Sequence, residues 1–184
     1  IIKLFGESKE NIKAIKYFNE NAGISREKKL SLFFENKDIE KITKIYSQMC
    51  SNFFSEAKPT IGVNEFLNKI KNKNKKINLY ILSGGDKEEI ILFLKKNYLI
   101  HFFKEILASN RTKQEHLKNK QISKNDIFIG DSKNDLKASL KTGIRFVLIE
   151  EYKSLESFPS NDSINKFVSF KSKNFQTFLK KIII

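Results

Sequence analysis

With 184 residues, the chain is long enough for one domain with a hydrophobic core, and its 40% hydrophobic and 30% charged residues are ordinary values for a globular protein. No apolar run approaches the roughly 18 residues of a transmembrane helix, and a lone cysteine, Cys50, excludes an intrachain disulfide, so we expect a cytoplasmic protein with no membrane partner. A net charge of +14 would suit nucleic acid, but all but three of the 35 basic residues are lysines, spread along the chain. This pattern argues against nucleic-acid binding as the main function, while the surplus charge favours anionic, phosphorylated substrates.

Helices are expected over residues 8–57. Three apolar stretches are separated by residues that are typical of helix ends. Gly23 can stop the first helix, Ser25 can cap the second and Asp38 can cap the third. The apolar residues at helical spacing are Ile12, Ile15 and Phe18, then Leu30, Phe33 and Phe34, and finally Ile42, Ile45, Met49, Phe53 and Phe54.

The pattern changes at Pro59-Thr60-Ile61-Gly62, which we take as the boundary between a helical unit at 1–58 and a second unit at 59–184. Beyond it, short apolar runs alternate with helical stretches, which predicts an α/β fold of the Rossmann-like type, with a parallel sheet and right-handed crossovers. Strands are expected at 77–82, 105–108, 127–129, 145–149 and 167–168, and helices at 63–70, 86–94, 112–119, 136–141 and 175–182. The lysine- and asparagine-rich residues 71–76 are expected to form a solvated loop.

The strand at 127–129 ends in Gly130 and Asp131, and Asp135 follows four residues later. Open α/β sheets bind ligands at the carboxyl ends of their strands, and two hard oxygen donors placed there suit Mg²⁺. The alternative is an ordinary strand–turn–helix with an aspartate near the helix N-terminus.

Ser83-Gly84-Gly85 follows another apolar strand, and a hydroxyl beside free backbone N–H groups can form an anion cradle there. The alternative is a plain turn into a helix capped by Asp86. Lys113 opens a helix after the weak strand at 105–108, where it could neutralise a phosphate or a carboxylate; position alone does not separate it from a solvated lysine.

Three other reactive side chains are expected to be structural. His101 lies in an apolar stretch, His116 is expected to be exposed on a helix, and Cys50 is expected in a helix core rather than as a nucleophile.

In this order, Ser83, Lys113 and Gly130-Asp131 through Asp135 resemble the second, third and fourth motifs of the haloacid dehalogenase (HAD) superfamily of phosphohydrolases. The resemblance covers about residues 60–150, and the preceding helices, with Asn21 to Arg26, resemble the helical cap of phosphoglycolate-phosphatase-like members. A receiver-like or other doubly wound protein is the alternative fold, although it does not explain this order of residues behind a helical segment.

The resemblance implies Mg²⁺-dependent hydrolysis of a small phosphorylated metabolite through an aspartyl-phosphate. It implies that Asp131 binds the metal, that Asp135 binds it or orients its waters, and that Lys113 balances the charges of nucleophile and phosphate. Ser83 and the N–H of Gly84 would hold the phosphate. Arg26 in the cap would touch the substrate or be a solvated loop arginine.

One departure from the family is the lack of any Asp-x-Asp, the first motif, which carries the nucleophile at the end of the first strand. By the resemblance, that strand would lie between those at 77–82 and 127–129, which should flank an empty slot. We consider two explanations: an N-terminally truncated phosphatase, or a non-catalytic relative that binds a phospho-ligand. The sequence indicates neither the substrate nor the oligomeric state.

Overall fold

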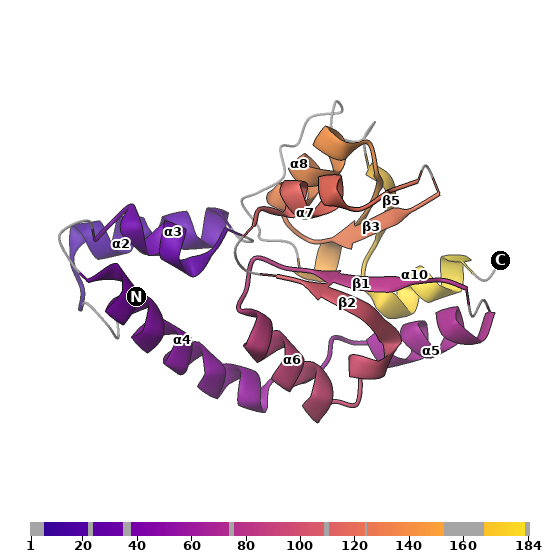
Figure 1. Ribbon diagram of the computed structural model, residues 1–184, viewed down its shortest axis with the longest axis horizontal. Helices are drawn as coiled ribbons and strands as arrows, with labels where there is room; N and C mark the ends of the chain where they lie inside the picture. Colours follow the sequence, from indigo (N-terminus) through magenta and orange to yellow (C-terminus); the bar gives the residue numbers. More distant parts are fainter. Residues whose placement is uncertain are drawn as a thin grey trace.

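The chain folds into helices and two small parallel sheets, as seen in a computed structural model (Figure 1). The structure describes residues 6–21, 24–34, 38–73, 76–108, 111–123, 125–152 and 168–182. The predicted α/β fold with parallel strands is therefore confirmed.

Three helices come first: α2 (Lys9–Glu20), α3 (Arg26–Ser31) and α4 (Ile39–Glu56). Figure 1 shows α2 and α3 lying apart from the sheets, with α4 leading back towards them. Each begins at a side-chain cap, since Ser8, Ser25 and Asp38 accept hydrogen bonds from backbone N–H groups three residues on. The caps predicted at Ser25 and Asp38 are thus confirmed, whereas the predicted stop at Gly23 lies outside the described residues.

Phe18, Leu30 and Phe34 form the small buried cluster of these helices. The expected apolar face of α4 is buried less than the sequence suggested, because none of its residues is fully buried and Phe53 is 70% exposed. Its neighbour Phe54 makes an edge contact with Phe93 of the α/β part, with ring centroids 6.3 Å apart.

The strands divide into two groups. β1 (Leu79–Leu82) pairs with β2 (Phe103–Leu107), and β3 (Ile127–Gly130) pairs with β4 (Arg145–Ile149), which pairs with β5 (Val168–Ser172). In the described part of the chain β1 and β3 belong to different sheets and do not pair with each other, whereas the slot expected between them stays a prediction. The expected strand residue Phe167 lies outside the described residues.

The helices of this part alternate with the strands. They are α5 (Val63–Lys73), α6 (Lys87–Lys96), α7 (Lys113–Asn119), α8 (Lys133–Thr142) and α10 (Phe175–Ile182), with short 3₁₀ turns at Ile100–Phe102 and Glu150–Tyr152. The prediction of a loop over 71–76 is wrong for residues 71–73, which continue α5. Lysines favour the last turn of a helix, where their charge meets the negative end of the helix dipole.

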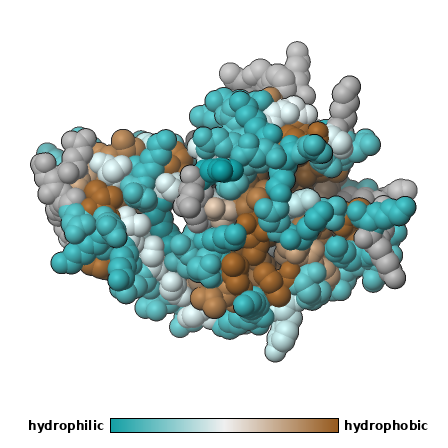
Figure 2. Space-filling model, viewed as in Figure 1, coloured by the Kyte–Doolittle hydropathy of each residue, from teal (hydrophilic) through white to brown (hydrophobic). Residues whose placement is uncertain are grey.

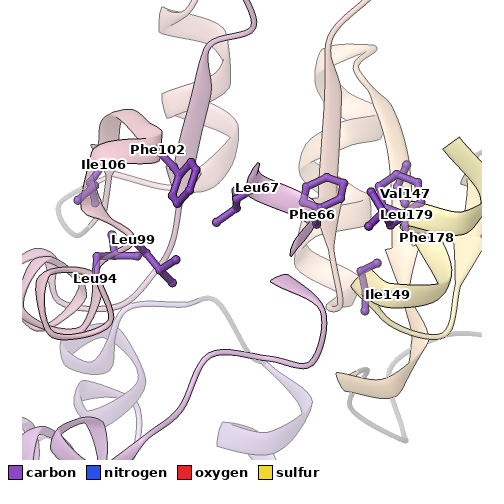
Figure 3. Packing of buried hydrophobic residues seen from close by; sticks show 10 residues of the cluster. All are labelled: Phe66, Leu67, Leu94, Leu99, Phe102, Ile106, Val147, Ile149, Phe178 and Leu179. Atoms are coloured by element: carbon purple, nitrogen blue, oxygen red, sulfur yellow. The ribbon is translucent and has the colours of Figure 1, made fainter. Parts of the chain in front are cut away.

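One hydrophobic cluster with residues from both sheets forms the main core. It is built from Phe66, Leu67, Leu94, Leu99, Phe102, Ile106, Val147, Ile149, Phe178 and Leu179. Figure 3 shows Leu67 of α5 between the group around β2 and the group around β4 and α10. Among the described residues, side-chain packing rather than a backbone ladder therefore connects the halves, through α5 in this cluster and through α7 against α8 in another.

The entry into α5 is fixed by Gly62. Its φ is +80°, and a Cβ at this position would lie 2.4 Å from the backbone nitrogen of Gln176 in α10. Only a glycine permits both this conformation and this approach of α10.

Hydrophobic residues also reach the surface over β1 and α6, where Figure 2 shows a brown patch. Tyr80 of β1 is 40% exposed and Leu92 of α6 is 66% exposed. The exposed Leu92 provides a matched control for the buried leucine of α5.

We expect Leu67→Ala to lower the free energy of unfolding by about 2–5 kcal/mol, because it opens a cavity between the two sheets. Leu92→Ala should change it by less than about 0.5 kcal/mol. Urea unfolding followed by circular dichroism measures both. Equal losses would show that Leu67 does not join the halves.

Candidate active site

A cavity of about 280 Å³ lies where the N-terminal helices meet the carboxyl ends of β1 and β3. Its walls come from both parts of the chain: Ile24, Arg26, Lys29, Tyr46 and Cys50 from the N-terminal helices, and Ser83, Gly84, Gly85, Lys113, Asp131 and Ser132 from the α/β part. The structure thus brings together Ser83, Lys113 and Asp131, which the sequence singled out separately.

Asp135 organises the turn after β3. Its Oδ2 accepts hydrogen bonds from the backbone N–H of Asp131 at 3.3 Å, and from the N–H and hydroxyl of Ser132 at 3.0 and 2.7 Å. Ser132 in turn caps α8 by accepting from the N–H of Asp135 at 3.2 Å. A Cβ on Gly130 would lie 2.6 Å from that of Asp135, so the close turn requires glycine there.

Lys113 reaches the same carboxylate from the neighbouring helix. Its Nζ forms an ion pair with Oδ1 of Asp135, and both side chains are largely buried, at 13% and 3% exposed. Thr112, which caps α7 in a reciprocal capping box with Glu115, fixes where the helix begins. Protein partners therefore occupy both oxygens of Asp135, and its position suits it to orient Lys113 and the turn.

Asp131 is the carboxylate that stays available. It lines the cavity, and no salt bridge to its side chain occurs among the described residues. Burial raises its pKa, the nearby charge of Asp135 raises it further, and Lys113 opposes them only in part. A carboxylate whose negative charge is only partly offset by its neighbours is suited to bind a cation.

Ser83 lies at the end of β1, where its N–H donates to the carbonyl of Leu107 at 2.9 Å and ties the strand to β2. Its Oγ accepts from the N–H of Gly85 at 3.0 Å and lines the cavity. The predicted cap of the next helix is confirmed, because Asp86 accepts from the N–H of Glu89 at 3.0 Å.

Arg26 connects the N-terminal helices with the α/β part. Its guanidinium donates to both carboxylate oxygens of Glu89 in α6, at 2.7 and 2.6 Å, and to Ser47 at 3.0 Å. The two side chains are 15% and 7% exposed. Arg26 borders the cavity, as expected of a substrate contact, but its charge is matched by a buried carboxylate rather than left in solvent.

Sequence reasoning missed two residues, Glu89 and Lys29. Glu89 stands beside Glu88 in a short charged stretch, and only its contact with a residue 63 positions away distinguishes the two. Lys29 follows Arg26 by three positions, so both lie on one helical face. That spacing could have indicated that Lys29 borders the same site as Arg26.

The structure corrects two of the three expectations for reactive side chains. His116 is half-buried rather than exposed, and Cys50 is half-buried beside the cavity rather than in a core. His101 is exposed, with its ring centroid 4.1 Å from that of Phe102.

In the part of the chain that the structure describes, no group of three or more His, Cys, Asp or Glu side chains could hold a metal. Nor is any of the helices described there long and apolar enough to cross a bilayer.

Comparison with known proteins gives a consistent picture. The sequence model of a family described as haloacid dehalogenase-like hydrolase matches residues 2–149. A haloacid dehalogenase-like family hydrolase from Streptococcus pneumoniae has a TM-score of 0.68 and 19% identity, over 98% of this chain and 86% of that one. CbbY from Rhodobacter sphaeroides, in complex with phosphate, has a TM-score of 0.66 and 12% identity, over 92% and 79% of the two chains. A predicted phosphoglycolate phosphatase from Haemophilus somnus has a TM-score of 0.66 and 16% identity, over 96% and 83%. No curated protein sequence matches significantly.

We expect Arg26→Ala to lower the free energy of unfolding by about 3–5 kcal/mol, because it leaves Glu89 buried without its partner. Arg26→Met combined with Glu89→Leu should recover most of this loss. Lys28→Ala, an exposed change on the same helix, is the control. If Arg26→Ala is as stable as Lys28→Ala in urea unfolding, the ion pair does not hold the helices in place.

We expect Asp131→Asn to raise the melting temperature at pH 7. The raised pKa of Asp131 means that the folded state favours its protonated form, so ionisation costs stability as the pH rises above the ordinary aspartate value of 3.8. The gain should therefore shrink as the pH falls towards that value. Asp126→Asn, at an exposed position, should show no such trend. A gain that is independent of pH would contradict the assignment.

Proposed function

Because the chain belongs to the haloacid dehalogenase-like hydrolase family, we propose that it forms the core and cap of a Mg²⁺-dependent phosphatase that hydrolyses a small phosphorylated metabolite through an aspartyl-phosphate. The cap would be residues 1–58 and the core residues 59–184. The family predicted from the sequence is confirmed by the match over residues 2–149. The reaction, its metal, its substrate and a cytoplasmic location are proposals.

The observation that carries the proposal is the meeting of Ser83, Lys113 and Asp131 at one small cavity. They come from the end of β1, the start of α7 and the end of β3, so their proximity is a product of the fold. A hydroxyl, an ammonium and a carboxylate are the groups that phosphoryl transfer needs for anion binding, charge balance and metal binding.

The donor set fits Mg²⁺. Asp131 offers a hard oxygen ligand that is partly desolvated and forms no salt bridge with the described residues, and Mg²⁺ is commonly bound by one or two carboxylates with water and phosphate in its other positions. Bound there, the ion would supply positive charge to the phosphate oxygens. Asp135 would act indirectly, because its oxygens hold the turn and Lys113.

Phosphate binding would use the opposite wall of the cavity. The hydroxyl of Ser83 and the backbone N–H of Gly84 lie at the start of the turn into α6, where they could meet an anion. Lys113, held in place by Asp135, would direct its remaining N–H bonds to the phosphate and to the nucleophile.

The nucleophile would come from a strand in the slot between β1 and β3. Its carboxylate would attack phosphorus, the alcohol would leave, and water would then release phosphate from the aspartyl-phosphate. The division of the sheet at this point supports the proposal, since a strand there would end beside both Ser83 and Asp131. We therefore propose that the complete enzyme includes such a strand, ending in Asp-x-Asp.

A second candidate is capture of a phospho-ligand without turnover. The absence of any Asp-x-Asp from the sequence favours it, because the phosphate-binding groups are present without a nucleophile of that motif. The two candidates share the binding site and differ only in the chemical step.

We expect Mg²⁺ with inorganic phosphate, both at millimolar concentration, to raise the melting temperature of the chain. Ligand at ten times its dissociation constant should add about 1.4 kcal/mol of stability. Ser83→Ala should weaken the response to phosphate, and Asp131→Asn should remove the response to Mg²⁺, whereas Asp126→Asn should behave as the parent chain. If neither ligand shifts the melting temperature, both candidates fail.

We expect the chain with an added N-terminal strand ending in Asp-x-Asp to hydrolyse an aryl phosphate in the presence of Mg²⁺. Asp131→Asn and Lys113→Met should each lower its kcat by about 100-fold or more, because each removes a charge that stabilises the transition state. Lys118→Met, an exposed change on α7, is the control for Lys113. An inert extended chain that still binds phosphate would favour the second candidate.

A further inference from the structure

We propose that Lys29, on the cap helix α3, receives a second anionic group of the substrate, so that the site binds phosphate monoesters that also carry a carboxylate or another phosphate. This inference rests on the proposed function, since it assumes that the phosphoryl group occupies the end of the cavity formed by Ser83 and Lys113. It assigns the charge of the leaving group, which the proposed function leaves open.

Lys29 is buried without a matching anion in the part of the chain that the structure describes. It is 9% exposed and borders the cavity. Among the described residues, no carboxylate forms an ion pair with it, and the buried carboxylate of Glu89 is held by Arg26 through both oxygens. The contacts that favour its charge are the ring of Phe18, whose centroid lies 4.5 Å from the ammonium, and the side chain of Cys50.

Such a burial is costly for an ammonium group. A cation–π contact returns only part of the free energy of hydration that a buried ammonium loses. The pKa of Lys29 is lowered, first by burial and then by the like charge of Arg26. An anion bound at this point would relieve both costs, which is the behaviour of a binding group rather than of a structural one.

The cavity places Lys29 where the leaving group would lie. Lys113 and Asp131 belong to the α/β part and would take the phosphoryl group and its metal, whereas Lys29 and Tyr46 belong to the N-terminal helices. A volume of about 280 Å³ leaves room for a few carbon atoms between these two ends. The charge of Lys29 would therefore select among small esters by their distal group.

The test is isothermal titration of the chain in Mg²⁺ with 3-phosphoglycerate and glycerol 3-phosphate, which share a three-carbon phosphate ester and differ in a carboxylate. We expect 3-phosphoglycerate to bind at least about tenfold more tightly. Propane-1,3-diyl bisphosphate is the third probe, and its rank against 3-phosphoglycerate shows which distal anion is preferred.

The variants distinguish an effect of Lys29 itself from an effect of the overall positive charge of the chain. Lys29→Met should bring the two esters within about twofold of each other without weakening glycerol 3-phosphate, and Lys29→Arg should keep the preference. Lys28→Met removes an exposed charge one position away and should behave as the parent chain. Lys29→Met should also raise the melting temperature, since it removes an uncompensated buried charge; a lower value would overturn the premise.

The outcomes distinguish this inference from the proposed function. Equal binding of the two esters by the parent chain would overturn the role of Lys29 and leave the phosphatase proposal standing. A preference that survives in Lys29→Met would likewise overturn the assignment. Failure of both esters and of inorganic phosphate to bind would overturn the proposed function and this inference together.

Discussion

The packing of α5 and its neighbours between two separate sheets is the constraint on which the rest of this structure depends. β1 and β3 do not pair with each other, yet the groups that would bind phosphate and metal lie at their ends. Leu67 and the cluster around it pack residues of both sheets together. The ion pair of Lys113 with Asp135 adds a second link, because α7 follows β2 and α8 follows β3. The geometry of the site is therefore a property of side-chain packing across the gap.

Charge pairing divides the residues around the cavity into two groups. Asp135 and Arg26 have protein partners and fix positions: the first holds the turn and Lys113, and the second holds α3 against α6. Asp131 and Lys29 are the charges that their neighbours do not neutralise. One is an anion at the core end and the other a cation at the cap end, which is the polarity expected for a metal-bound phosphate joined to an anionic leaving group.

Local pattern was sufficient to predict the parallel strands, the caps at Ser25, Asp38 and Asp86, and the turn at Gly130. Each depends on residues within a few positions of one another, so the sequence carries the whole signal. The resemblance to a family also predicted that the strands at 77–82 and 127–129 would not pair with each other, as the separate sheets show for the described residues. The sequence could not predict the partner of Arg26, because Glu89 lies 63 positions away and looks like any other first-turn glutamate. Burial of Lys29 was missed for the same reason, since it depends on how the cap meets the core.

The free edges of β1 and β3 have a consequence for handling and folding of the chain. An unpaired strand edge presents a row of N–H and C=O groups to which any extended segment can add, including another copy of the same molecule. Each of these strands has only four residues, which limits the number of backbone hydrogen bonds that another strand could form with its edge. The exposed apolar side chains beside β1 favour association with another molecule. Among the described residues, these two edges are therefore the places where self-association at high concentration would be expected to begin.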